Sequence, residues 1–120
     1  ILSNQSYFMT LDTPENKAFL EKYHETYGSD ALVNSIGEAT YCATHLYALA
    51  VEKAGSAERD KVLAALPEVS FQAPQGTVSI DAATQHMITN SIIGRARADG
   101  MFDIVEHFGQ IPPNPRCSLK

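Results

Sequence analysis

The fold is decided by residues 69–108, which have the sequence VSFQAPQGTVSIDAATQHMITNSIIGRARADGMFDIVEHF. Apolar and polar residues alternate along Thr77–Asp81, a pattern typical of a half-buried strand. The turn sequence Ala73-Pro74-Gln75-Gly76 separates this run from a second short β-type segment, Val69-Ser70-Phe71. The stretch therefore begins with two predicted strands joined by a tight turn.

The rest of this stretch predicts a hairpin. Residues 86–98 and 101–108 are two long runs on either side of Asp99-Gly100, a dipeptide that strongly favours a two-residue turn. The prolines of Ile111–Pro115 cannot donate to a strand ladder, so an extended tail is expected after Gly109. The C-terminal part of the chain is thus predicted to be β structure ending in a hairpin.

Upstream of Val69 the pattern is helical. Thr13-Pro14-Glu15 combines a capping residue, a proline suited to the first turn and an acid that complements the helix dipole. This predicts a helix that ends at Gly28. A short extended segment, Gln5–Leu11, is expected before it.

Two more helices are predicted before the strands. Ser35-Ile36-Gly37-Glu38 has capping-box spacing and opens a nearly uncharged run up to Gly55, so this helix is expected to be buried on most faces. Ser56 can cap a third helix, which Pro67 ends. The predicted fold class is α/β, with three helices followed by β-strands and a C-terminal hairpin.

Length and composition limit the class of protein. A chain of 120 residues with 44% hydrophobic residues is expected to form one small folded unit with one core. Its net charge of −5 argues against binding to nucleic acid or to an acidic membrane surface. No apolar run approaches the roughly 20 residues of a membrane span. Phosphate-binding loops and nucleophile elbows are absent from the sequence, so nucleotide binding and triad catalysis are not expected.

The cysteines and histidines predict neither a metal site nor a disulfide. Cys42 and His45 lie three residues apart on one helix face, but zinc needs three or four ligands and no second pair is present. Cys42 lies in an apolar stretch and Cys117 in the tail, so a bridge between them is not expected. The prediction is that the chain holds no metal and no cofactor.

Several residues near the helix starts have two interpretations. Tyr7, Phe8 and Tyr41 suit a hydrophobic core or the wall of a small-ligand pocket, and composition favours the core. Glu38 is more often a capping-box partner than an acceptor for a ligand. From the residues alone, the chain is an α/β domain without a catalytic signature.

Two sequence blocks carry a family resemblance, SYFMTLDTPENKAF at 6–19 and FQAPQGTVSID at 71–81, with GEATYCATHLYALAVEKAGS between them. From about Ser6 to Pro115 the chain resembles the C-terminal third of type 1 periplasmic-binding-protein-like receptors. It is most similar to the urea and short-chain amide binders within the branched-chain amino acid binding family. That family includes receptors of ABC transporters and a cytoplasmic amide sensor that controls amidase expression.

The resemblance implies a fragment of a two-lobed receptor that closes on a small ligand. Residues 1–11 would be a crossover segment, 12–92 part of the N-terminal lobe, 93–115 a return hairpin to the other lobe and 116–120 a tail. The implied function is a periplasmic, non-enzymatic solute-binding component that delivers urea, an amide or an amino acid to ABC permease subunits. The implied alternative is a cytoplasmic amide sensor with the same fold.

The resemblance also implies four ligand-binding residues. Tyr7, Phe8 and Tyr41 would be aromatic walls, and the Glu38 carboxylate would accept N–H groups of an amide or amine. Because the strands that such helices normally cover would lie upstream of Ile1, the helices at Thr13 and Glu38 would expose apolar surface. The isolated chain is therefore expected to self-associate or to be one piece of a longer protein.

Overall fold

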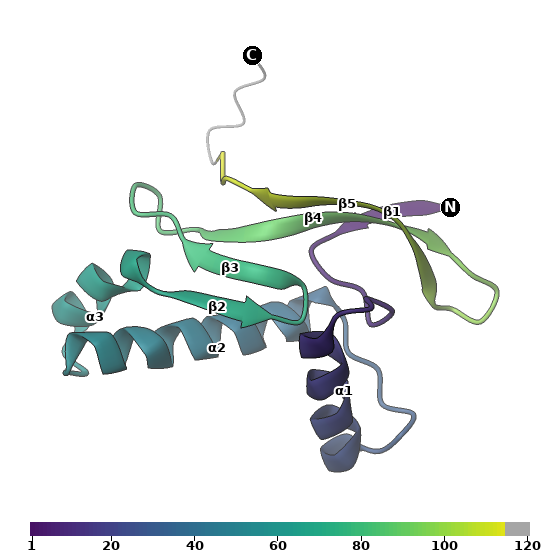
Figure 1. The fold of residues 1–120 in the computed structure, drawn as a ribbon, viewed down its shortest axis with the longest axis horizontal. Helices are drawn as coiled ribbons and strands as arrows, with labels where there is room; N and C mark the ends of the chain where they lie inside the picture. Colours follow the sequence, from purple (N-terminus) through teal and green to yellow (C-terminus); the bar gives the residue numbers. More distant parts are fainter. Residues whose placement is uncertain (115–120) are drawn as a thin grey trace.

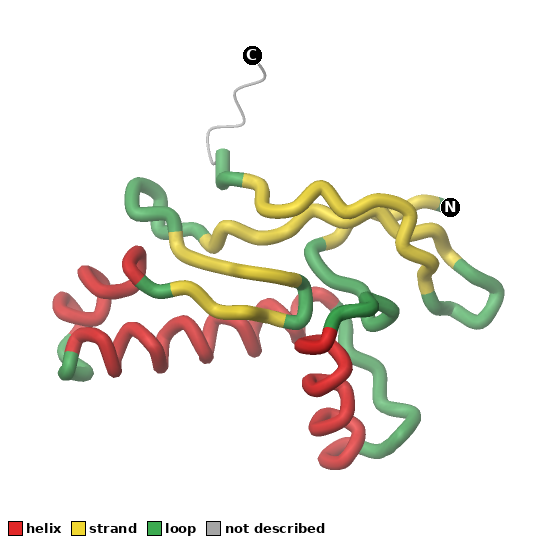
Figure 2. The backbone as a smooth tube through the Cα atoms, viewed as in Figure 1, coloured by secondary structure: helices red, strands yellow, loops and turns green. Residues whose placement is uncertain are grey.

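The computed structural model describes residues 1–114 and contains helices on one side of an antiparallel sheet (Figures 1 and 2). The helices are α1 (Pro14–Tyr27), α2 (Ser35–Ala54), α3 (Arg59–Ala65) and the 3-10 helix η1 (Leu66–Glu68). The strands are β1 (Leu2–Gln5), β2 (Ser70–Ala73), β3 (Gly76–Ile80), β4 (Met87–Ala96) and β5 (Phe102–Ile111). The predicted α/β class, with helices first and a terminal hairpin, is confirmed. Cys117 and the tail 116–120 lie outside the described residues, so the predictions made for them stay predictions.

The N-terminal segment differs from its prediction. The strand there is Leu2–Gln5, and the expected extended segment Gln5–Leu11 is mostly a loop. A backbone hydrogen bond of 3.1 Å from Leu11 N–H to the Phe8 carbonyl closes a turn in this loop. The turn brings the apolar side chains of Tyr7, Phe8 and Leu11 into contact with Ile92 of β4, and their burial stabilises the loop.

Strand β4 is the centre of the sheet. It pairs antiparallel with β1 over Leu2↔Arg95 to Gln5↔Ile92, and with β5 over most of its length. Its first residues, Met87 and Ile88, also pair with β3, which in turn pairs with β2. The register between β4 and β5 shifts at two places, as bulges do. One strand therefore connects the N-terminal strand, the C-terminal hairpin and the β2–β3 pair.

The molecule is a flat slab in which α2 runs along the β2–β3 pair and α1 stands away from it (Figure 1). Its extents are 47 × 44 × 18 Å, so the slab is about as thick as one layer of helices on one sheet. The expected single core is wrong for residues 1–114, where the buried side chains form three separate clusters. A slab this thin has no interior deep enough to join them.

Two of the three predicted caps need correction. Thr13 caps α1 as expected, since its Oγ1 accepts from Asn16 N–H at 3.1 Å. The capping box at Ser35 is wrong, because Asn34 caps α2 by accepting from Gly37 N–H at 2.9 Å. Ser56 does not cap α3, which begins at Arg59. Starting α2 one residue earlier moves Glu38 to the fourth helical position, where it faces the sheet.

Helix α2 is buried on one face only. Glu38, Cys42, Leu46 and Ala50 line that buried face, whereas Ile36 and Tyr47 are 75% and 52% exposed on the other. The prediction of burial on most faces is therefore wrong for residues 1–114. Within that range, no helix combines the length and apolar character needed to cross a membrane.

Several large apolar side chains are exposed on the surface of residues 1–114. Leu32, Ile36 and Tyr47 are each more than half exposed, and water contact with such groups is unfavourable. We expect the isolated 120-residue chain to self-associate in solution. Sedimentation velocity at several concentrations checks this, and a single compact monomer across the range would contradict it.

Candidate functional site

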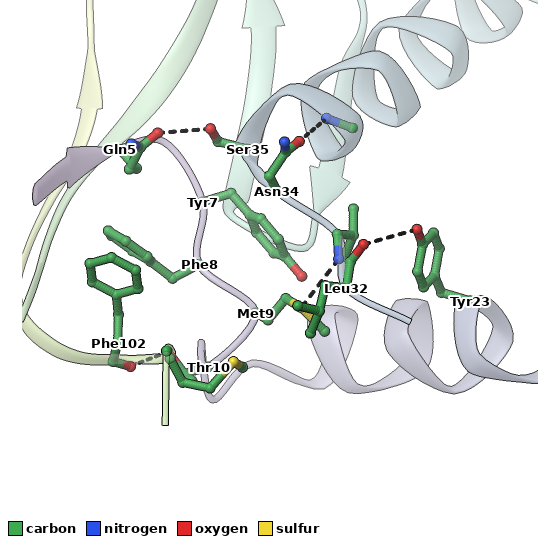
Figure 3. A pocket seen from close by; sticks show the side chains of 14 residues that line it. Gln5, Tyr7, Phe8, Met9, Thr10, Tyr23, Leu32, Asn34, Ser35 and Phe102 are labelled. Atoms are coloured by element: carbon green, nitrogen blue, oxygen red, sulfur yellow. Dashed lines mark hydrogen bonds between the residues drawn. The ribbon is translucent and has the colours of Figure 1, made fainter. Parts of the chain in front are cut away.

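A cavity of about 430 Å³ lies where three loops meet (Figure 3). The first is the loop after β1, the second joins α1 to α2, and the third is the tip of the β4–β5 hairpin. The lining residues are Gln5, Tyr7, Phe8, Met9, Thr10, Tyr23, Leu32, Val33, Asn34, Ser35, Gly37, Gly100, Met101 and Phe102. Residues far apart in the sequence thus form one concave surface of the size that small ligands occupy.

An aromatic pair forms the apolar wall of this cavity. The rings of Phe8 and Phe102 lie with their centroids 4.9 Å apart and tilted by 37°. Behind Phe8 lies Gly94 of β4, where a Cβ atom would come within 2.8 Å of Phe8 Cζ. The absence of a side chain at Gly94 lets the Phe8 ring pack directly on the strand, which positions it in the wall.

Neutral polar groups complete the lining. Ser35 Oγ donates to Gln5 Oε1 at 2.8 Å, and the Thr10 hydroxyl donates to the Phe102 carbonyl at 2.6 Å. Tyr23 likewise donates its hydroxyl to the Leu32 carbonyl at 3.2 Å. These hydroxyls have used their hydrogens, so each can act only as an acceptor toward a ligand. The amide Nδ2 of Asn34 makes no hydrogen bond within residues 1–114 and is a ready donor.

Charge is absent from this wall. None of the cavity-lining residues within 1–114 is Asp, Glu, Lys, Arg or His. A second cavity of about 430 Å³ is lined by His107 and by the charged residues Asp12, Arg97 and Asp103. Arg97 pairs with Asp103 at 3.3 Å, and Asp12 pairs with Lys17. The first cavity offers an apolar surface with uncharged hydrogen-bonding groups, and we take it as the candidate binding site.

Tyr7 and Phe8, two of the four predicted site residues, line this cavity. Phe8 contributes to its wall. The Tyr7 hydroxyl instead donates to Asn16 Oδ1 at 2.8 Å, and only 2% of the residue is exposed. Burial and the nearby Glu38 carboxyl raise the pKa of Tyr7 well above its usual value of 10.0. Tyr7 therefore stays neutral and anchors the loop while its neighbour faces the cavity.

Glu38 lies outside the cavity and is completely buried. Its Oε1 accepts from Cys42 Sγ at 3.1 Å and from Gln75 N–H at 3.3 Å, and its Oε2 accepts from Gln75 Nε2 at 2.7 Å. Burial raises the pKa of Glu38, and these hydrogen bonds partly oppose the rise. The geometry gives this carboxyl a role in joining α2 to the β2–β3 turn, and its ligand role stays a prediction.

Tyr41 also lies outside the cavity, in a row of rings between α1, α2 and β2. Its ring centroid is 4.7 Å from that of Phe19 and 4.4 Å from that of His45. His45 stacks on Phe71 at 4.5 Å, so the ring of this histidine packs against an aromatic face. No group of three or more potential metal ligands is found within residues 1–114. A ligand role for Tyr41 stays a prediction as well.

Twelve of the fourteen lining residues were not singled out as site candidates by the sequence, among them Phe102, Asn34 and Ser35. Phe102 follows the hairpin turn and reaches the cavity only because β5 folds back along β4. Asn34 and Ser35 flank the start of α2, and the capping signal that marks this position could have identified them. A ligand at the start of a helix contacts the free backbone N–H groups and the capping side chain. A capping sequence therefore also indicates a position where a ligand can bind.

Comparison with known proteins shows the family of this chain. The family described as a periplasmic binding protein domain matches residues 1–119. A Geobacillus stearothermophilus protein named limonene hydroxylase is 35% identical over 94% of this chain, which covers 21% of that protein. Leu/Ile/Val-binding protein homolog 6 of Brucella abortus (strain 2308) is 27% identical over 82% of this chain, which covers 26% of that protein.

A solved structure is similar over nearly the whole chain. It is a solute-binding protein of an ABC transporter from Rhodopseudomonas palustris HaA2 in complex with p-hydroxybenzoic acid, with 30% sequence identity and a TM-score of 0.74. The match covers 99% of this chain and 33% of that one. The chain thus spans about a third or less of each of these relatives. The urea and short-chain amide branch stays a prediction. With the match over residues 1–119, the wider family is confirmed: the chain belongs to the periplasmic binding protein domain family.

Proposed function

We propose that this chain supplies one wall of the ligand cleft in a solute-binding component of an ABC transporter. The observation that carries the proposal is the cavity between the loop after β1, the start of α2 and the hairpin tip. The remaining cleft surface would come from residues outside this chain, in agreement with the third of the length that it covers in a solved relative. Permease subunits of the transporter are the proposed partners, and the periplasm is the proposed compartment.

The chemistry of the wall favours a small solute with an uncharged amide-type group or an apolar body. Asn34 can donate to a carbonyl oxygen, and the Ser35 and Thr10 hydroxyl oxygens can accept N–H groups. Phe8 and Phe102 can hold an aliphatic or aromatic part. Urea, short-chain amides and branched-chain amino acids fit this description. A charged end of an amino acid would need its partner elsewhere in the cleft.

Binding without catalysis is part of this proposal. General acid–base chemistry needs a titratable group in contact with the substrate, and the lining residues of this cavity within 1–114 supply only tyrosine hydroxyls. The tyrosines donate to Asn16 and to the Leu32 carbonyl, which holds their protons in internal bonds. A cytoplasmic amide sensor could use the same cavity. An export signal at the start of the whole gene product would favour transport over that second function.

A thermal-shift screen of the full-length protein tests the proposal. Urea, acetamide, L-leucine and 4-hydroxybenzoate are the probes, and a solute that binds only the folded state raises the melting temperature. A shift of several degrees at millimolar concentration of one probe would support the proposal. No shift with any of the four probes would contradict it, and so would hydrolysis of urea or acetamide by the protein.

Replacing Phe102 by alanine is expected to weaken binding of the best probe by about tenfold, because an aromatic wall is lost from the cavity. Phe108 is a matched control, since it lies on the same strand, is 57% exposed and does not line the cavity. Isothermal titration of both alanine variants measures the difference. Equal affinities in the two variants would show that the ligand binds outside this cavity.

A further inference from the structure

Asn16 is a buried polar residue that no ligand contact explains. It lies in the first turn of α1, where a polar side chain usually faces water, yet only 1% of it is exposed. It does not line either cavity of the described residues. Its burial is favourable only if every polar atom finds a partner.

The partners of Asn16 all belong to the loop after β1. Its Nδ2 donates to the Met9 carbonyl at 2.9 Å and to the Leu11 carbonyl at 2.8 Å. Its Oδ1 accepts from the Tyr7 hydroxyl at 2.8 Å. The two carbonyls require the NH₂ group and the hydroxyl requires the oxygen, so the orientation of the amide is fixed by its partners.

This loop is the part of the chain that positions the cavity wall. Phe8 lies between the anchored residues Tyr7 and Met9, and both Phe8 and Met9 line the cavity. Met9 also extends the connection, since its Sδ accepts from Val33 N–H at 3.3 Å in the loop before α2. The amide of Asn16 therefore holds the loop after β1 directly. Through the Met9 sulfur it also connects to the loop before α2, so it supports two of the three loops that form the cavity.

We infer that Asn16 is a positioning residue for ligand binding, a role that rests on the proposed function. It holds the 7–11 loop in the conformation that places Phe8 and Met9 in the wall. Aspartate at this position keeps the acceptor for Tyr7 but puts a carboxylate oxygen against the two carbonyl oxygens. Alanine removes all three hydrogen bonds. Either change is expected to free the loop, and neither replaces a residue that lines the cavity.

The test combines a ligand-independent and a ligand-dependent measurement on the full-length protein. Hydrogen exchange reports on the loop through the Leu11 amide, which bonds to the Phe8 carbonyl, with the Leu46 amide in α2 as reference. Titration with the best probe among urea, acetamide, L-leucine and 4-hydroxybenzoate reports affinity, at a temperature where each variant is folded. Asn4→Asp is the matched control, because Asn4 is exposed and its side chain, within the described residues, bonds only to Ser91.

Asn16→Asp and Asn16→Ala are expected to speed exchange at Leu11 at least tenfold, to leave Leu46 unchanged and to weaken binding at least tenfold. Faster exchange with unaltered affinity overturns the inference, and so does unaltered exchange. If no probe binds the wild type, the proposed function fails and this role fails with it, whereas the exchange data still show whether Asn16 holds the loop.

Discussion

Replacing Glu38 by alanine is expected to lower the free energy of unfolding by about 3 kcal/mol. The change leaves the Gln75 amide, the Gln75 backbone N–H and the Cys42 thiol without their acceptor in a site that water does not reach. It also leaves a void between α2 and the β2–β3 turn. Urea unfolding of the 120-residue chain, followed by circular dichroism at one fixed concentration for all variants because the chain is expected to self-associate, measures the loss.

Glu52→Ala is the matched control for this experiment. Glu52 lies on the same helix but is exposed, and such surface changes usually stay within about 0.5 kcal/mol. A loss at Glu38 no larger than that at Glu52 would contradict the role of this carboxyl in joining helix to turn.

The pH dependence of the same carboxyl has a definite sign. Because burial raises its pKa in the folded chain, the unfolded chain ionises first as pH rises. The contribution to stability is complete below the usual pKa of 4.5 and is lost as pH rises through the folded-state pKa. Asp12, Asp81 and Asp99 have lowered pKa values and act in the opposite direction. The free energy of unfolding of the wild type minus that of Glu38→Gln, in which those aspartates cancel, should therefore fall as pH rises from 4.5.

Replacing Gly94 by alanine should destabilise the chain by about 2 kcal/mol, although alanine is normally the better residue in a strand. The new Cβ would lie 2.8 Å from Phe8 Cζ and 3.0 Å from both Cε atoms, so the ring must move. Phe8 is only 7% exposed and packs on Phe102, which leaves it little room. The displaced ring would also enter the cavity and reduce its volume.

A double-mutant cycle with Phe8→Leu tests this cause. Leucine lacks the Cζ atom that meets the new methyl group, so Gly94→Ala should cost little in that background. The expected coupling is at least about 1 kcal/mol. The same cost in both backgrounds would show that the strand itself, and not the ring, disfavours alanine.

Local patterns predicted most of the fold correctly because the relevant signals lie within a few residues of one another. The alternation along Thr77–Asp81 corresponds to β3. The predicted hairpin is also observed, but residues 97–101 connect its strands, so the turn at Asp99-Gly100 is longer than two residues. Strand β1 was not predictable in the same way, because its residues are mostly exposed and are held by pairing with Arg95 and its neighbours. Nor could α2 be predicted to expose Ile36, since burial depends on what lies beside a helix and not on its own composition.

The candidate site was predictable only where it is local. Tyr7 and Phe8 are adjacent and both line the cavity, as expected. Phe102 reaches them through the β4–β5 pairing, a contact across more than ninety residues of sequence. Glu38 shows the same limit, because its partner Gln75 is 37 residues away and lies in a turn sequence that predicts only backbone shape.

The position of β4 between several partner strands also constrains how sequences of this kind can change length during evolution. A residue inserted into Met87–Ala96 would reverse the side chains after it and shift their pairing with both β1 and β5. An insertion in the turn between β3 and β4, or at Asp99-Gly100, lies outside the strands and leaves their register unchanged. Length differences among related sequences should therefore collect in these two turns, while the ten residues of β4 keep their number.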